Sequence, residues 1–178
     1  SDRLQEDPRR TVFDIIPASD SLFVVGRLDF ESEGLMLLTD DGDLANKLTH
    51  PRYGHEKEYR VLLARKPDDQ QLNAWRRGVV LEDGHRTQPA EVKLETIAGK
   101  GAWVRVIMKE GHKRQIREIC SQIGLPIVKL IRVRIGTLLQ GSLKPGDFRP
   151  LTPVEVKNLK SLENSNLKKT VFRPKKIN

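Results

Sequence analysis

The chain has 178 residues, of which 37% are hydrophobic, so it can bury a core as one domain or as two small lobes that share a sheet. No segment reaches the roughly 18 to 20 consecutive apolar residues that span a bilayer, and residues 1–10 are polar and charged rather than signal-like. We therefore expect a cytoplasmic protein with no membrane segment. Cys120 is the only cysteine, which excludes an intrachain disulfide and a cysteine-rich zinc site.

The formal net charge of +8 is concentrated in the last third of the chain. Residues 1–108 carry a net charge of −3, whereas residues 109–149 and residues 157–178 carry +6 each. Clustered lysines and arginines favour a polyanionic partner, most simply nucleic acid, because they release the counterions condensed on phosphates. For residues 157–178, a solubilising tail is an equally good interpretation.

The first half of the chain predicts short strands and helices in alternation. Apolar or alternating segments indicate three strands, at residues 22–27, 34–39 and 58–64. Helical spacing and breaker residues indicate three helical segments, at residues 11–16 up to Pro17, at residues 43–49, and from Pro67 to about Gly78.

The second half predicts an antiparallel sheet and a basic helix. Residues 79–108 alternate like strands, with hairpin tips expected at residues 83–84 and 99–101. A helix at residues 112–123, a strand at 125–135, a loop at 141–148 and a final helix from Thr152 into the tail follow. The expected fold class is α+β, with an extended, mainly antiparallel mixed sheet flanked by helices.

Asp29 lies in the segment Gly26-Arg27-Leu28-Asp29-Phe30-Glu31-Ser32-Glu33-Gly34, which separates two apolar runs. Loops held between buried strands commonly carry reactive carboxylates. For this segment alone, an ordinary surface turn with a solvated aspartate is the better interpretation. Glu31 and Glu33 resemble the paired carboxylates of a hydrolase. Both lie in one short loop, and no acid elsewhere in the sequence lies in a comparable segment, so we do not predict a hydrolase.

Further motifs bear on the choice between a solvated and a reactive Asp29. Lys57-Glu58-Tyr59 begins a predicted strand, and Glu110-Gly111-His112-Lys113-Arg114-Gln115-Ile116-Arg117 opens the basic helix. With Leu130-Ile131-Arg132-Val133-Arg134-Ile135-Gly136 and Leu143-Lys144-Pro145-Gly146, these segments resemble the RsuA/RluB-type family of pseudouridine synthases in order and separation.

The resemblance covers residues 7–156. It implies a pseudouridine synthase catalytic domain over residues 1–156, followed by a basic helix end and tail over residues 157–178. Members of the family usually carry a small N-terminal RNA-binding domain and then a strand with a Lys-Pro motif, and neither occurs in this sequence. We therefore expect a catalytic domain without that front part.

The resemblance also implies an isomerase that converts specific uridines of ribosomal RNA to pseudouridine, as a monomer and with no cofactor and no metal. It implies that Asp29 is the nucleophile and that Arg117 is its cationic partner. It further implies that Tyr59 stacks on the flipped base and is a candidate for removing the C5 proton. Large-subunit RNA is slightly preferred as the substrate. A non-catalytic RNA-binding module that retained the fold is the alternative.

Physical chemistry supports this triad. A stacked uridine must leave the RNA helix to be modified, and the site that receives it must exclude water. Burial favours the neutral form of an aspartate, and a nearby guanidinium opposes that effect. An aromatic ring at position 59 replaces lost base stacking, and its hydroxyl supplies proton chemistry. The four histidines have no spacing that suggests a metal site.

Six basic residues are the predicted RNA contacts. The spacing of Lys113 and Arg114 from Arg117 predicts that all three share one helix face. Arg132 and Arg134 alternate with apolar residues and are expected on one sheet face, where RNA contact and plain exposure remain open interpretations. The full set is Arg27, Lys57, Lys113, Arg114, Arg132 and Arg134.

Overall fold

The computed structural model describes residues 11–16 and 21–169 of the chain. Pro17 and the tail after residue 169, both named in the predictions above, lie outside these residues. Within the described part of the chain, no helix combines the length and the apolar character that crossing a bilayer would require.

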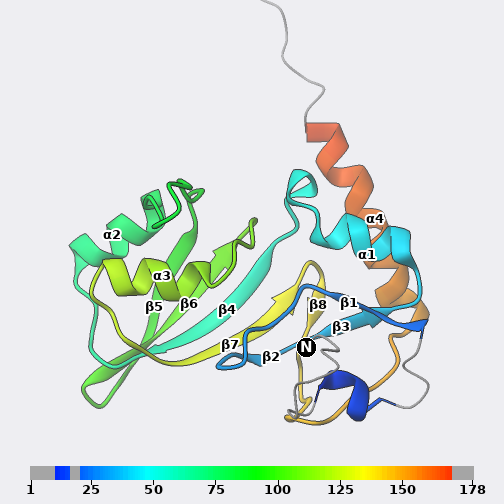
Figure 1. Ribbon diagram of the computed structural model, residues 1–178, viewed down its shortest axis with the longest axis horizontal. Coiled ribbons are helices and arrows are strands. Elements are labelled where there is room, and N and C mark those ends of the chain that lie inside the picture. The colour runs from blue at the N-terminus through cyan, green and yellow to red at the C-terminus, as the bar shows by residue number, and fades with distance from the viewer. Residues whose placement is uncertain (1–10, 17–20, 170–178) are drawn as a thin grey trace, which may run out of the picture.

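The described residues form eight strands and several helices (Figure 1). The strands are β1 (Phe23–Val25), β2 (Glu33–Gly34), β3 (Leu37–Thr39), β4 (Lys57–Leu63), β5 (Glu91–Ala98), β6 (Gly101–Met108), β7 (Ile127–Ile135) and β8 (Leu138–Leu139). The α-helices are α1 (Gly42–Thr49), α2 (Asp69–Arg77), α3 (Gln115–Gln122) and α4 (Pro153–Lys169). Two 3-10 turns cover Val12–Asp14 and Pro51–Tyr53.

Six strands form one sheet. Five of them follow the order β2-β7-β4-β6-β5, and the sixth, β8, pairs with β7. All its pairings are antiparallel except that of β2 with β7. Strands β1 and β3 form a separate antiparallel ribbon. The predicted α+β class with a mainly antiparallel mixed sheet is therefore confirmed.

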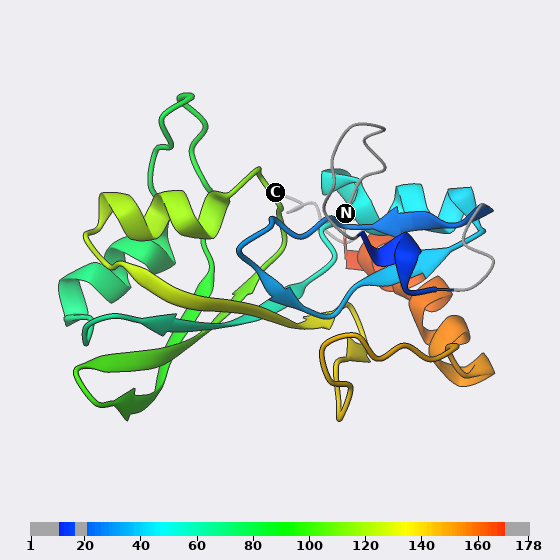
Figure 2. The same ribbon diagram turned by 60° about the horizontal axis from the view of Figure 1, so that its bottom comes forward.

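One core lies between the sheet and the helices α2 and α3, which cover the same face of β4, β5 and β6 (Figure 2). Val61 and Val104 of the sheet are fully buried there, as are Trp75 of α2 and Ile119 of α3. The opposite face of these strands carries no helix (Figure 2). The sheet therefore has one covered face and one open face.

A second core joins the β1–β3 ribbon to α1, α4 and the end of β7. Val25, Leu48, Ile135 and Leu159 are its most buried members. Leu159 lies beyond residue 156, where the sequence analysis ended the catalytic domain, and α4 continues through that position without interruption. The division into a domain and a tail stays a prediction, but the first turns of α4 pack as part of the fold.

Local signals explain the position of α2. The Asp68 carboxylate accepts a hydrogen bond of 2.8 Å from the backbone N–H of Gln71, which satisfies a free donor at the helix start. Gly78 ends the helix with φ of +81°, a conformation that favours glycine. Its neighbour α3 begins at Gln115, three residues later than predicted, because Arg114 has φ of +54° and cannot continue a right-handed helix.

Candidate active site

The centre of the site is a pair of neighbouring residues on the covered face of the sheet. Tyr59 of β4 lies directly opposite Arg132 of β7. Residues paired across two strands project from the same face, so both side chains project toward the helix side. The phenol of Tyr59 therefore lies beside the Arg132 guanidinium.

Arg132 is only 2% exposed, and its guanidinium donates to three backbone carbonyl oxygens of the 26–35 loop. The distances are 2.7 Å to Gly26, 3.3 Å to Arg27 and 2.9 Å to Leu35. Burial lowers the pKa of Arg132, and the contact with Tyr59 acts in the opposite direction. Arg132 therefore holds both ends of the loop against the sheet.

Gly34 allows this loop to lie against β7. It pairs with Arg132 in the parallel register and has φ of +113°. A Cβ atom at this position would lie 2.2 Å from the backbone oxygen of Arg132. Only glycine fits such a close backbone approach. The close contact with β7 therefore explains why the residue at the end of the polar segment is a glycine.

Asp29 stands at the first position of a tight turn within the loop. The Ser32 N–H donates to the Asp29 carbonyl oxygen at 2.9 Å, so Phe30 and Glu31 occupy the tip. Asp29 is partly buried. Among the residues that the structure describes, no hydrogen bond or ion pair to the Asp29 carboxylate is recorded. The turn thus presents a carboxylate whose acceptor positions are open.

Two arginines at the start of α3 hold the tip of this turn. Arg114 donates to the Glu31 carboxylate at 2.9 Å, and Arg117 donates to the Glu31 backbone oxygen at 2.6 Å. The hydrogen bond from Arg114 and then the charge of Arg117 lower the pKa of Glu31. The Nε atom of Arg117 is buried and has no hydrogen-bond partner among residues 11–16 and 21–169, with the Glu31 carboxylate 3.6 Å away.

These contacts differ from the predicted pair of Asp29 and Arg117. Arg117 contacts the Asp29 turn through Glu31, and also through Ser32, whose hydroxyl lies 3.5 Å from its guanidinium. No ion pair of Asp29 with Arg117 is found among the described residues. The reason is local, because Glu31 offers both a backbone and a side-chain oxygen nearer to α3. Sequence reasoning discounted Glu31, and its contacts with residues 83 and 86 positions away give no local signal.

Lys57 lies on the same face as Tyr59, two residues before it on β4. Burial lowers the pKa of its ammonium, and the nearby charge of Arg132 lowers it further. Two cations therefore share the covered face beside Tyr59. Lys57 is a partly buried member of the site rather than a solvated surface lysine.

The prediction that Arg132 and Arg134 share one sheet face is wrong. Along β4, the neighbours Glu58 and Tyr59 pair with Arg134 and Arg132, so an extra residue, Val133, interrupts the register of β7. Such a bulge turns the following side chain to the other face. Arg134 consequently lies on the open face, where it binds Glu58 at 2.8 Å and Glu56 at 3.1 Å. Arg132, expected at the surface, is buried.

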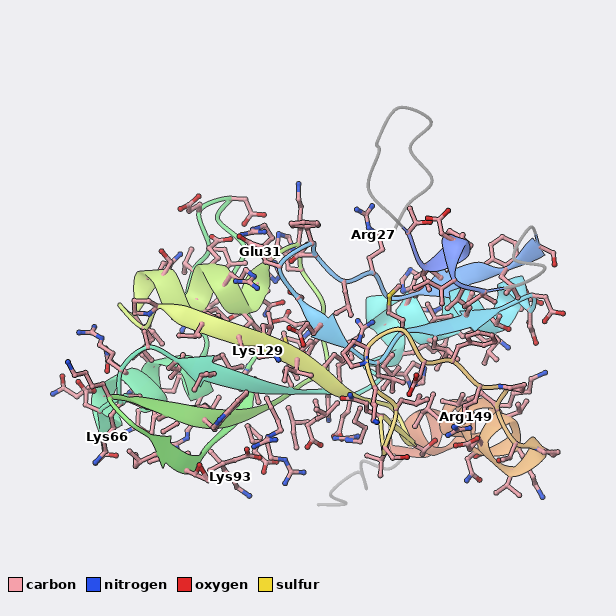
Figure 3. The ribbon with its side chains drawn as sticks, turned by 90° about the horizontal axis from the view of Figure 1, so that it is seen from below. Arg27, Glu31, Lys66, Lys93, Lys129 and Arg149 are labelled. Carbon is pink, nitrogen blue, oxygen red and sulfur yellow. The ribbon has the colours of Figure 1, made fainter. Side chains whose placement is uncertain are left out.

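The remaining predicted RNA contacts lie around the turn. Arg27 points away from the molecule, whereas Glu31 lies against the start of α3 (Figure 3). Arg27 is exposed, as are Lys113 and Arg114 just before α3. The expectation that Lys113 and Arg114 share a helix face with Arg117 is wrong, because both precede the helix. Arg27, Lys113 and Arg114 nevertheless leave cations accessible near Asp29.

The geometry defines a class of site: a carboxylate in a rigid turn, whose loop is bound by an arginine that lies opposite a phenol, among buried and exposed cations. The sequence model of the RNA pseudouridylate synthase family matches residues 6–122. The chain therefore belongs to this family of RNA-modifying enzymes. In the part of the chain that is described, no three metal-binding side chains gather, and the expected lack of a cofactor stays a prediction.

Named relatives extend this result. The chain is 40% identical over 159 residues to the "Ribosomal large subunit pseudouridine synthase E" of Xanthomonas campestris, covering 80% of this chain and 83% of the relative. It is 38% identical to the "Ribosomal large subunit pseudouridine synthase B" of Bacillus subtilis, covering 89% of this chain and 66% of the relative. An "Uncharacterized RNA pseudouridine synthase" of Aquifex aeolicus is 35% identical, with 86% of this chain and 61% of that protein covered. The chain thus spans less than two thirds of the length of some relatives.

Solved structures agree on the fold. A "Crystal structure of pseudouridylate synthase" superposes with a TM-score of 0.76 at 32% identity, covering 84% of this chain and 65% of that one. A protein in the "Structure of H/ACA RNP bound to a substrate RNA containing 2'-deoxyuridine" reaches a TM-score of 0.53 at 19% identity, over 67% of this chain and 40% of that one. The second likeness shows the fold alone.

Proposed function

We propose that this chain isomerises specific uridines of ribosomal RNA to pseudouridine, with large-subunit RNA as the preferred substrate. The names of the relatives from Xanthomonas campestris and Bacillus subtilis support the choice of large-subunit RNA. The chain's own support is the accessible, basic rim near Asp29, which suits a phosphate backbone. The reaction neither adds nor removes atoms. In this proposal the enzyme acts as a monomer in the cytoplasm.

In this proposal Asp29 is the nucleophile: its carboxylate forms a bond to the sugar or to the base, and that bond breaks again as the product forms. The bond from uracil N1 to ribose C1′ breaks, the detached base turns, and a bond from C5 to C1′ forms. The C5 proton leaves, and N1 takes up a proton. A carboxylate that is held by its backbone, and whose oxygens have no partner in the described part of the chain, can attack without first breaking an ion pair. This combination is the observation that carries the proposal.

Tyr59 and Arg117 complete the proposed catalytic set. Tyr59 stacks on the flipped base and is the candidate for removing the C5 proton, with Arg132 opposite it on the neighbouring strand. Arg117 positions the Asp29 turn through the Glu31 carbonyl oxygen. Its unpartnered buried Nε can donate to a carboxylate or to a substrate oxygen. Lys57 contributes positive charge beside them, and Arg27, Lys113 and Arg114 bind phosphates.

The test is chemical mapping of pseudouridine in ribosomal RNA taken from bacteria that lack this gene. The wild-type chain is compared with Asp29→Asn, which keeps the size of the side chain, and with Asp40→Asn, an exposed aspartate outside the site. We expect new pseudouridine in large-subunit RNA from the wild type and from Asp40→Asn, and none from Asp29→Asn. Equal product from Asp29→Asn refutes the role of Asp29. No product from the wild type, with salt-sensitive binding retained, supports the alternative of a non-catalytic RNA-binding module.

A further inference from the structure

Phe30 is the most exposed large apolar side chain among the described residues, at 80%. Single exposed apolar residues are common on protein surfaces, so exposure alone carries no argument. The position of Phe30 does, because it directly follows Asp29 and occupies the tip of the same tight turn. Asp29 is partly buried, whereas the phenyl ring of its neighbour stands out from the rim.

The turn that carries Phe30 is fixed at several points. Arg132 holds the loop before it, through the carbonyl oxygens of Gly26 and Arg27. On the other side, Arg117 and Arg114 bind the backbone and the side chain of Glu31, the residue after Phe30. An aromatic ring on a rigid turn loses little conformational freedom when a partner packs on it. The turn therefore restricts the conformations that the Phe30 backbone can adopt.

The surroundings of the ring suit RNA. Exposed Arg27 precedes the turn, and exposed Lys113 lies just before Arg114, which binds the Glu31 carboxylate, so Arg27 and Lys113 are the cations that attract phosphates there. Arg27 points away from the molecule, whereas Glu31, next to Phe30 at the tip, lies against the start of α3 (Figure 3). An apolar ring between cations is the usual composition of a surface that stacks nucleic-acid bases.

We propose that Phe30 stacks on an RNA base adjacent to the target uridine and supports the helix from which that uridine has left. This inference rests on the proposed function, because the neighbour of a flipped base loses one stacking partner. The phenyl ring replaces that partner at the moment when the uridine enters the site beside Asp29. Stacking on an aromatic side chain is sequence-tolerant, so Phe30 contributes to capture of the open state rather than to the choice of base.

The first experiment measures the rate of pseudouridine formation in the same ribosomal RNA at a concentration below saturation. We expect Phe30→Ala to slow the reaction by about 5- to 150-fold, the range that one stacked base corresponds to. Phe30→Tyr keeps the ring and is expected to remain close to the wild-type rate. Phe148→Ala is the matched control, because Phe148 is also exposed, at 52%, and its neighbour Arg149 lies far from Glu31 in Figure 3. A Phe30→Ala rate equal to the wild-type rate overturns the proposal.

The second experiment reads stacking without catalysis. Phe30→Trp and Phe148→Trp each place an indole in an otherwise unchanged protein, whose own two tryptophans form a common background. We expect the ribosomal RNA to quench the added emission of Phe30→Trp and to leave that of Phe148→Trp unchanged. Equal behaviour of the two variants overturns the proposal. Quenching of Phe30→Trp alone, in a protein that forms no pseudouridine, refutes the proposed function while the stacking contact stands.

Discussion

Arg132 and Arg134 lie two positions apart on β7 and serve opposite faces of the same sheet in different ways. On the open face, Arg134 forms ion pairs with Glu56 and Glu58, and Glu58 also binds Arg105 at 2.7 Å. On the covered face, Arg132 donates to three backbone carbonyls and lies opposite Tyr59. No carboxylate pairs with Arg132 within the described residues.

This difference separates a neutralised surface from one that keeps its positive charge. Carboxylates on the open face compensate the arginines there, so that face offers little to a polyanion. Carbonyl oxygens satisfy the hydrogen bonds of Arg132 without cancelling its charge, and the buried ammonium of Lys57 adds to it. The positive charge of Arg132 and Lys57 therefore lies beside Tyr59, where we propose that RNA binds, whereas in the turn that carries Asp29 the Glu31 carboxylate compensates Arg114.

The largest expected effect separates the two arginines directly. Arg132→Met leaves three carbonyls of the 26–35 loop without a donor, so we expect a loss of about 3 to 5 kcal/mol in the free energy of unfolding. Arg134→Met, on the open face, is expected to cost about 1 kcal/mol, because Arg105 still binds Glu58. Urea denaturation followed by circular dichroism measures both. Equal losses would contradict the distinction between the faces.

The second-largest loss of stability is expected at Gly34, where β2 approaches β7 closely. In Gly34→Ala the new methyl group meets the backbone of Arg132, and we expect a loss of about 2 to 3 kcal/mol. Gly84→Ala is the matched control, because Gly84 also has a positive φ, +85°, but its added Cβ meets nothing within 4 Å. Its loss should be about 1 kcal/mol, from backbone strain alone. Thermal unfolding of both variants shows whether the contact with β7 adds to that strain.

The smallest expected effect concerns Glu58 on the open face. Burial opposes its ionisation, but hydrogen bonds from Arg105 and Arg134 outweigh this and place the pKa of Glu58 below the ordinary value of 4.5. A lowered pKa contributes stability that is complete above the unfolded-state value and is lost as the pH falls through the folded-state value. Glu58→Gln should therefore be less stable than the wild type by about 1 kcal/mol at pH 7. The gap should close as urea denaturation is repeated at pH values falling below about 4.5. A gap independent of pH would show that the charge of Glu58 is irrelevant.

Sequence patterns predicted the elements better than the contacts between them. The start of α2 at Pro67-Asp68 and its end at Gly78 follow from capping chemistry that is written in adjacent residues. The strand before Asp29 and the strand of Tyr59 follow from apolar runs, whereas the strand predicted at residues 34–39 is wrong, because β2 and β3 are separate strands of different sheets. All these features depend on neighbours in the chain.

The missed features depend on distant partners or on a single backbone angle. One extra residue at Val133 moves Arg134 to the open face, and no residue type in that strand predicts a bulge. The left-handed conformation of Arg114 delays the start of α3. The contacts of Glu31 with α3 appear only once the loop and the helix are brought together by folding.

The most direct test of the central claim follows the hydrogen at uracil C5. That hydrogen must leave when C5 bonds to ribose C1′, so ribosomal RNA labelled with tritium at C5 should release tritium to water as pseudouridine forms. We predict release by the wild type and by Asp40→Asn, and release slower by at least about 1,000-fold with Asp29→Asn. Tritium release by Asp29→Asn at the wild-type rate would contradict the account.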